Sequence, residues 1–179
     1  MAPKHADCDQ YREPSHEEPY SPFDWLIIGP GPAQARDAAQ VRSVRQETFP
    51  ATEEQVSQAR QVTRQTLVDH PAVDLAVLLV SELTSNSVRH SGSRFFTLAI
   101  RRTFEGHLRI GVTDEGRHGL PRLVSTDFQD ESGRGMRLVD ALARQWGIIR
   151  RPAAGMAVWF DVDHTIAATG QGLFLLEEP

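Results

Sequence analysis

The order of the predicted elements constrains this chain more than any other feature. Between residues 51 and 162 the residue patterns predict helix, helix, strand, strand, loop, helix, strand, strand. A parallel fold needs strands that alternate with helices, and this order does not alternate. The sequence therefore predicts an α+β protein: a two-layer sandwich with helices on one face of a mixed, mainly antiparallel sheet.

Three helices are predicted. Thr52 is a candidate N-cap in front of two acidic residues, and apolar residues then recur at helical spacing as far as His70-Pro71. A second, strongly apolar helix runs from about residue 73 to 90, and a third from 134 to 146. Alternating or β-branched runs predict strands over residues 42–49, 95–102, 107–113, 147–150 and 156–162, with a hairpin turn at Glu105-Gly106.

The domain is expected to span residues 45–162. Residues 1–44 form a proline-containing, acidic leader that is expected to be largely disordered. Its apolar island, residues 25–28, either docks on the domain or a partner or forms a weakly ordered turn. The tail, residues 163–179, shows no clear period and is expected to be loosely attached.

Charge and hydropathy argue against several classes of protein. A net charge of −5 argues against direct nucleic-acid binding by the chain as a whole. No apolar run approaches the roughly 18 residues of a membrane span, and no secretory signal opens the chain. Cys8 is the single cysteine, so an internal disulfide is impossible. We therefore expect a cytoplasmic protein.

Glu82 and Asn86 lie four residues apart in the apolar second helix, so they share one face. A carboxylate and an amide on such a helix cost free energy unless something satisfies them. A phosphate-bound Mg²⁺ is one candidate, since that cation takes oxygen ligands. The alternative is a partly exposed helix edge where both side chains are solvated.

Two glycine-containing segments have residue types that suit a nucleotide. Asp114 ends a predicted strand and could accept a hydrogen bond from an exocyclic amine, while Gly116 would let a base lie against the backbone. An ordinary Asp-x-Gly turn is the alternative. Gly133 and Gly135 open the third helix, where free N–H groups can bind an anion. The alternative there is a simple glycine-rich helix start.

Taken in order, these segments resemble the GHKL ATP-binding superfamily, and within it the bacterial anti-sigma-factor serine/threonine kinases. The resemblance covers roughly residues 45–162 and implies a Bergerat-type ATP-binding fold. It rests on residues 49–51, 59–60, 81–90, 112–116, 133–139 and 146–147.

The resemblance implies a role for each matching residue. Asn86 would ligate the Mg²⁺ that bridges the ATP phosphates, and Glu82 would be the general base. Asp114 would bind the adenine amine, with Gly116 beneath the base. Residues 119–132, beginning at Gly119, would form a lid over the phosphates. The backbone of Gly133 and Gly135 and the charge of Arg134 would complete the phosphate site.

Three further residues match without a settled role. Arg60 corresponds to a first-helix arginine with which the family contacts protein partners; the alternative is a solvated helix arginine. Arg89 and His90 lie near the phosphate end of the second helix. Cations are also favoured there simply because it is a helix C-terminus, which is the better interpretation.

The chain departs from the family at two places. The last motif normally reads Gly-Lys-Thr or Gly-Thr, whereas here it is Gly155-Met156-Ala157, so the threonine hydroxyl and the lysine are missing. One lost hydrogen bond costs about 0.5–1.5 kcal/mol, which predicts weakened rather than abolished ATP binding. The Asp-x-Gly motif is also stretched by one residue before Gly119, and the lid is short.

The leading hypothesis is an ATP- and Mg²⁺-dependent protein kinase that phosphorylates an anti-anti-sigma protein on serine or threonine, sequesters a sigma factor, or does both. The alternative is a nucleotide-sensing or nucleotide-independent binding module in transcription regulation. A histidine-kinase catalytic domain is disfavoured, because no dimerising helical hairpin with a phospho-acceptor histidine precedes the domain. A homodimer is possible.

Overall fold

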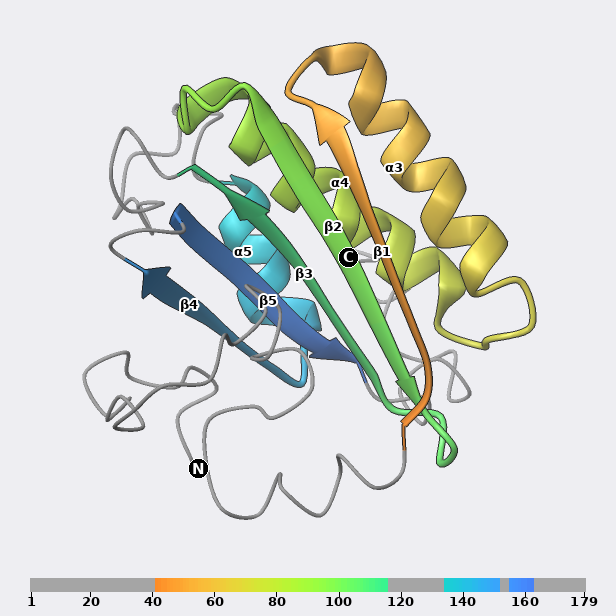
Figure 1. Cartoon of the computed structure of the whole chain (residues 1–179). Coiled ribbons are helices and arrows are strands. Elements are labelled where there is room, and N and C mark those ends of the chain that lie inside the picture. The colour runs from red at the N-terminus through yellow and green to blue at the C-terminus, as the bar shows by residue number, and fades with distance from the viewer. Residues whose placement is uncertain (1–40, 116–133, 152–154, 163–179) are drawn as a thin grey trace, which may run out of the picture.

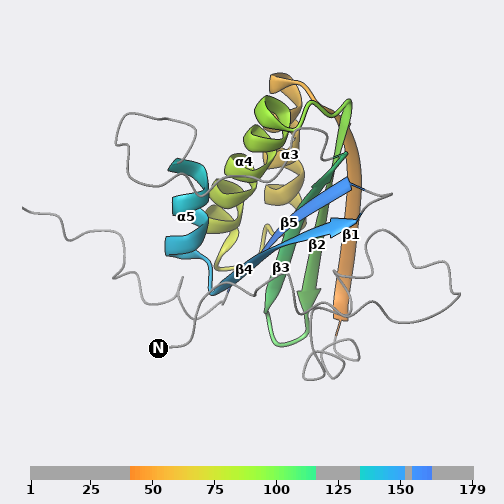
Figure 2. The ribbon, with the colours of Figure 1, turned by 90° about the vertical axis from the view of Figure 1, so that its left-hand side faces the viewer.

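The protein folds as two layers, a five-stranded sheet with three helices packed on one of its faces (Figures 1 and 2). The structure, a computed structural model, describes residues 41–115, 134–151 and 155–162. The predicted α+β sandwich is confirmed. Its elements are β1 (Val41–Pro50), α3 (Glu53–Thr66), α4 (Val73–His90), β2 (Phe95–Thr103), β3 (Leu108–Asp114), α5 (Arg134–Leu142), β4 (Gln145–Arg151) and β5 (Gly155–Val162).

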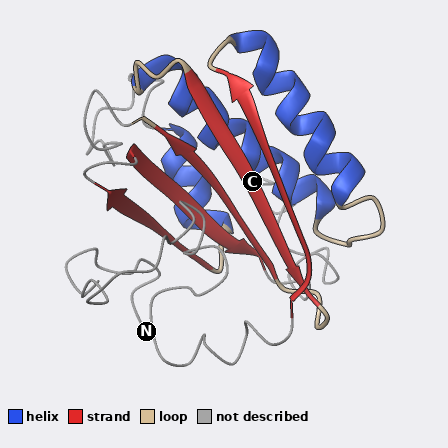
Figure 3. Ribbon diagram, viewed as in Figure 1, coloured by secondary structure: helices blue, strands red, loops and turns tan. Residues whose placement is uncertain are grey.

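The strands lie in the order β1-β2-β3-β5-β4 (Figure 3). Every neighbouring pair is antiparallel. The prediction of a mixed, mainly antiparallel sheet allowed for some parallel pairing, and the described part of the sheet contains none. At the turn between β2 and β3, Gly106 adopts φ +83° and donates to the Thr103 carbonyl. The predicted hairpin turn is confirmed, and glycine suits it because L side chains rarely adopt this backbone region.

The third helix is shorter than predicted. It ends at Leu142, and β4 begins at Gln145, two residues before the expected start. The Arg144 N–H already donates to the carbonyl of Asp161 on β5, so the backbone has joined the sheet at this point. Trp146 was predicted to end the helix but lies on β4. Its indole is buried, and its N–H donates to Asp140 Oδ1 at 2.9 Å.

Thr52 is the N-cap residue of α3, as predicted, with extended backbone at φ −125°. Its side chain makes no capping hydrogen bond to the helix backbone. Instead the hydroxyl donates to the Glu54 carboxylate, which holds the pKa of Glu54 below its ordinary value. The first-turn acids remain where the helix dipole favours them.

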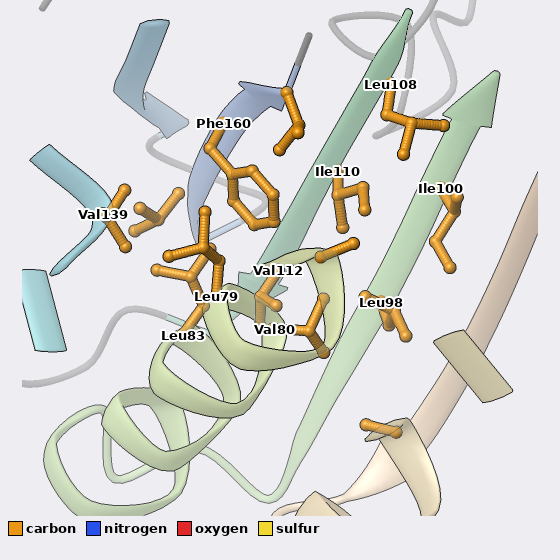
Figure 4. Packing of buried hydrophobic residues seen from close by; sticks show 14 of the residues in the cluster. Leu79, Val80, Leu83, Leu98, Ile100, Leu108, Ile110, Val112, Val139 and Phe160 are labelled. Carbon is orange, nitrogen blue, oxygen red and sulfur yellow. The ribbon is translucent and has the colours of Figure 1, made fainter. Parts of the chain in front are cut away.

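The main core lies between the sheet and α4. Leu79, Val80 and Leu83 point from the helix toward side chains of the central strands (Figure 4). The strand residues that meet them include Leu98, Ile100, Ile110, Val112 and Phe160. Burying one such side chain contributes about 1.5–3 kcal/mol, so this face fixes the position of α4 on the sheet. Leu75, near the start of α4, is only partly buried.

Among the described helices, none is both long and apolar enough to cross a bilayer.

Candidate nucleotide site

Helix α4 carries Glu82 and Asn86 one turn apart, each half-buried. They flank the face that Leu79 and Leu83 press into the core, so the polar pair lies along the border of the apolar stripe. The helix is rigidly packed through that stripe. Its position therefore determines where the carboxylate and the amide can reach.

The first turn of α5 lies directly against this pair. A Cβ placed on Gly135 would lie 2.5 Å from Glu82 Oε2 and 3.3 Å from Asn86 Nδ2. A side chain at this position would have to displace the end of the flexible Glu82 side chain. The structure thus brings Gly135, Glu82 and Asn86 together, and places the carboxylate beside a helix N-terminus, the positive end of the helix dipole.

Asp114, the last residue of β3, is buried at the same end of the sheet as the C-terminus of α4. The chain leaves α4 at His90 and enters β2 at Phe95, and Phe96 is the register partner of Asp114. The loop between them is tied to β3, because Ser93 Oγ accepts a hydrogen bond from the Glu115 N–H at 2.8 Å.

A second set of hydrogen bonds fixes the loop to α4. Ser91 Oγ donates to the Ser87 carbonyl at 2.6 Å and accepts from the Ser93 N–H at 3.0 Å. The end of the helix that carries Asn86 is therefore connected through short side-chain bonds to the end of the strand that carries Asp114. The sequence pattern indicated only that the second helix ends at about residue 90, so this connection was missed.

Gly155 fixes the other side of Asp114. It has φ +89°, and a Cβ on it would overlap the Asp114 carbonyl oxygen. The start of β5 thus lies tight against the end of β3. In the sequence Gly155 stood out only as part of the Gly155-Met156-Ala157 departure, although a glycine in a strand can signal such a close approach.

The sheet register places Met156 and Ala157, the two departing residues of the last motif, on opposite faces of the sheet. Met156 is the register partner of Asp114, and it is buried on the helix-covered face with that carboxylate. Ala157 pairs with Thr113, and both face the opposite side of the sheet, since successive strand residues alternate. Only the methionine lies where it can change the surroundings of Asp114.

Several predicted site residues lie outside the described residues: Gly116, Gly119, Gly133 and the lid over residues 119–132. Arg134 begins α5, and only its backbone is described. The structure therefore brings together the acid, the amide and one glycine of the predicted site, with Asp114 at the same end of the sheet.

The predicted cationic residues lie on the surface of the helices. Arg60 is exposed on α3 and donates to Ser57 Oγ at 2.7 Å. Arg89 Nε lies 3.9 Å from Glu53 Oε1, and His90 is exposed at the end of α4. An ion pair to the start of α3 and the favourable helix end both account for Arg89 without a phosphate.

The donor set near Gly135 fits a magnesium ion that is held mostly by phosphates. The described residues contain no cluster of three or more His, Cys, Asp or Glu side chains that could hold a metal. Mg²⁺ usually keeps several waters and takes one or two protein ligands plus substrate phosphates. The Asn86 amide, whose Nδ2 would lie 3.3 Å from a Cβ on Gly135, offers one oxygen, which is compatible with that arrangement.

Comparison with known proteins identifies the family. The histidine kinase-like ATPase domain family matches residues 49–162, which is more than half of the chain. The chain belongs to this family. As a histidine kinase-like ATPase domain it is a member of the GHKL superfamily, as the ordered motifs predicted, and the family implies ATP binding.

One curated relative matches this chain over a limited stretch. An uncharacterized protein of Streptomyces coelicolor is 47% identical over 47 residues, which are 26% of this chain and 45% of that protein. The chain thus aligns with less than half of this relative.

Two solved structures match this chain at low sequence identity. The RsbU and RsbW domains of Rv1364c from Mycobacterium tuberculosis match with a TM-score of 0.51 and 21% identity over 67% of this chain and 32% of theirs. The histidine kinase domain of a blue-light-activated kinase from Erythrobacter litoralis has a TM-score of 0.42 and 19% identity, over 68% and 64% of the chains. At this level of identity the first likeness concerns the fold alone.

Proposed function

We propose that this ATPase domain is a Mg²⁺-dependent serine/threonine protein kinase of the anti-sigma type. It would phosphorylate an anti-anti-sigma protein, sequester a sigma factor, or do both, and would work in the cytoplasm, possibly as a homodimer. The observation that carries the proposal is the contact of the Glu82 carboxylate and the Asn86 amide with the first turn of α5 at Gly135. This contact supports the proposal, because the carboxylate and the amide, which would act as base and metal ligand, lie beside a helix end that favours phosphate.

Glu82 would act as the general base. Its carboxylate would take the proton from a serine or threonine hydroxyl of the partner as that oxygen attacks the γ-phosphorus. The first turn of α5, with the backbone of Gly133 and Gly135 and the charge of Arg134, would stabilise the phosphate oxygens. Asn86 Oδ1 would hold the Mg²⁺ that neutralises them.

The adenine would bind at the other side of the same end of the sheet. Asp114 would accept the exocyclic amine, Gly116 would lie beneath the base and Gly119 would begin the lid. Gly155 supports this role, since its tight contact with the Asp114 backbone holds that residue in place. Arg60, exposed on α3, would contact the protein partner.

Transfer of label from γ-labelled ATP tests the kinase. We expect phosphorylation of one of a panel of small antagonist proteins from the same genome, and its loss in Glu82→Gln, which keeps the shape of the side chain but cannot take a proton. Glu105→Gln, in the exposed β2–β3 turn, is the matched control. Equal transfer by wild type and Glu82→Gln would exclude the proposed base.

A nucleotide-sensing binding module is the second candidate, and the burial of Met156 opposite Asp114 favours it. A thioether offers an adenine site no hydroxyl donor. Titration calorimetry with Mg-ATP distinguishes three cases. Binding with transfer supports the kinase, binding without transfer supports the sensor, and no heat at millimolar ATP leaves a nucleotide-independent module.

A further inference from the structure

Ser87, the residue after Asn86 on α4, has a buried hydroxyl group without a hydrogen-bond partner among the described residues. The residue is 5% exposed, and its Oγ neither donates to nor accepts from any group in that part of the chain. Buried polar groups nearly always have a partner, because desolvating one without compensation costs free energy. The Ser87 hydroxyl therefore needs an explanation.

The hydroxyl leaves a nearby acceptor unused. A serine or threonine inside a helix can donate to the carbonyl four residues earlier, which for Ser87 is the carbonyl of Leu83. Other hydroxyls within or at the end of the described helices do so: those of Thr63, Thr66, Thr84 and Ser91. The Ser87 hydroxyl is thus turned away from the backbone of its own helix.

Ser87 lies on the side of α4 that faces the sheet. It follows Val80 by seven residues and Leu83 by four, so it continues the line along which these side chains point at the central strands (Figure 4). One helical turn advances about 6 Å, and two strand residues advance about 7 Å. Asp114 lies two residues beyond Val112 on the same face of β3, toward the same end of the sheet. The hydroxyl is therefore placed near the Asp114 carboxylate.

Hydrogen bonds fix this placement. The Ser87 carbonyl accepts from Ser91 Oγ at 2.6 Å, and Ser93 Oγ, two residues further on, accepts from the Glu115 N–H at 2.8 Å. The helix turn that carries Ser87 is therefore bonded, through the loop, to the residue that follows Asp114.

The edge of adenine needs a donor in the protein as well as an acceptor. Its exocyclic amine donates, while N1, the ring nitrogen beside the amine, accepts. An ionised carboxylate only accepts, and the thioether of Met156 cannot donate. N1 lies across the ring from N9, which carries the ribose, so it enters deepest when the phosphates reach the half-buried Glu82 and Asn86. A buried hydroxyl near Asp114 is placed to meet it.

We propose that the Ser87 hydroxyl donates to N1 of adenine, directly or across one water, and replaces the hydroxyl that the last motif lacks. The inference rests on the proposed ATP site and deepens it, because it adds a donor on α4 to the acceptor Asp114 on β3. In the free protein the hydroxyl has no partner among the described residues, and bound adenine supplies one. An ATP site can then persist although Met156 and Ala157 offer no hydroxyl.

Titration calorimetry of the full chain with ATP and with 1-deaza-ATP, in which a C–H group replaces N1, tests the inference. We expect wild type to bind ATP about two- to tenfold more tightly than 1-deaza-ATP, the range of one hydrogen bond. Ser87→Ala should bind ATP more weakly by a similar factor and should no longer distinguish the two nucleotides. Without nucleotide it should melt at the wild-type temperature or above, because it removes a buried hydroxyl that is not bonded to the described residues.

Thr84→Val is the matched control, since it removes a buried hydroxyl on the same helix that already donates to the Val80 carbonyl. It should keep the wild-type affinity for ATP and the wild-type preference over 1-deaza-ATP.

Two results would overturn the inference alone. Ser87→Ala could bind ATP as tightly as wild type, or it could still prefer ATP to 1-deaza-ATP by the wild-type factor. A wild type that binds no ATP would overturn the ATP site together with the inference. Wild-type binding with the expected preference but without label transfer would contradict the kinase and support the role of Ser87.

Discussion

At the scale of single residues, the candidate site depends on two glycines, whose lack of a side chain lets other groups approach closely. Gly135 lets α5 approach α4 so closely that the Glu82 carboxylate and the Asn86 amide meet helix backbone. Gly155 does the same for β5 against Asp114. Both glycines are positioning residues, and their substitution separates the geometry of the site from the chemistry of its acids.

Gly135→Ala should lower phosphoryl transfer by at least about tenfold, since a 1 Å displacement of a reacting group costs up to about 10²-fold. The new Cβ would push aside the end of the flexible Glu82 side chain, so stability should fall little or rise. Steady-state transfer and thermal melting measure both. Ala141→Gly, on the exposed side of α5, should cost about 0.5–1 kcal/mol and leave transfer unchanged. Full activity in Gly135→Ala would contradict the close contact.

Met156→Thr should tighten ATP binding by up to roughly tenfold, because a hydroxyl beside Asp114 can donate one hydrogen bond worth about 0.5–1.5 kcal/mol. Ala157→Thr is the matched control, since this position faces Thr113 on the other side of the sheet. Calorimetry gives both affinities. A gain for Ala157→Thr and none for Met156→Thr would overturn the assignment of faces.

At the scale of elements, the turn between α3 and α4 is fastened to the β2–β3 hairpin. His70 is buried; its Nδ1 accepts from the Ala72 N–H at 3.1 Å and its Nε2 donates to the Gly106 carbonyl at 2.8 Å. Arg102 donates to the neighbouring Asp69 at 2.9 Å. The sequence marked His70-Pro71 only as a helix break, yet its imidazole fixes the far end of α4 on the sheet.

His70→Ala should lower the free energy of unfolding by about 1–3 kcal/mol, because it leaves the Ala72 N–H and the Gly106 carbonyl without these partners. Val68→Ala, at a side chain that is 78% exposed in the same turn, should change stability by no more than about 0.5 kcal/mol. Urea unfolding measures both variants. Equal effects would show that the imidazole does not hold the hairpin.

Asp69 gives this contact a pH dependence. The hydrogen bond from Arg102 lowers the pKa of Asp69 below its ordinary value of 3.8. Its contribution to stability is therefore complete above the unfolded pKa and is lost as the pH falls through the lower folded pKa. Asp69→Asn should be less stable than wild type at pH 7, and in denaturant unfolding the gap should narrow as the pH falls below 3.8 and close below the lowered folded-state pKa. A gap that is constant with pH would contradict this.

At the scale of the whole molecule, the sheet divides two surfaces. The helix-covered face carries the core and the candidate nucleotide site. The other face carries Trp159, with the guanidinium of Arg109 over its ring and Asp161 bound to that guanidinium. Successive side chains of a strand point to opposite faces, so Asp114 and Arg109, both on β3, lie on different sides of the sheet. Substitutions of Arg109 or Asp161 that break their ion pair should therefore lower the free energy of unfolding and leave nucleotide binding intact.

Asp161→Asn should lower the free energy of unfolding by about 3 kcal/mol, because it leaves the buried Arg109 without its carboxylate. The double variant Arg109→Met with Asp161→Leu should recover most of that loss, since apolar replacement of a buried pair is often neutral. Calorimetric melting measures stability, and ATP titration should give wild-type affinity in all variants. A single variant as stable as wild type would show that the pair is solvated.

The sequence alone determined the element order, the sandwich class and the spacing of Glu82 and Asn86, because periodicity and turn residues are local signals. Local pattern could not place the end of α5, since pairing with β5 overrides the helical propensity near Trp146. Register decided which of Met156 and Ala157 faces Asp114, and close packing decided that Gly135 abuts the acid. These are contacts between residues distant in sequence, and only the folded chain brings them together.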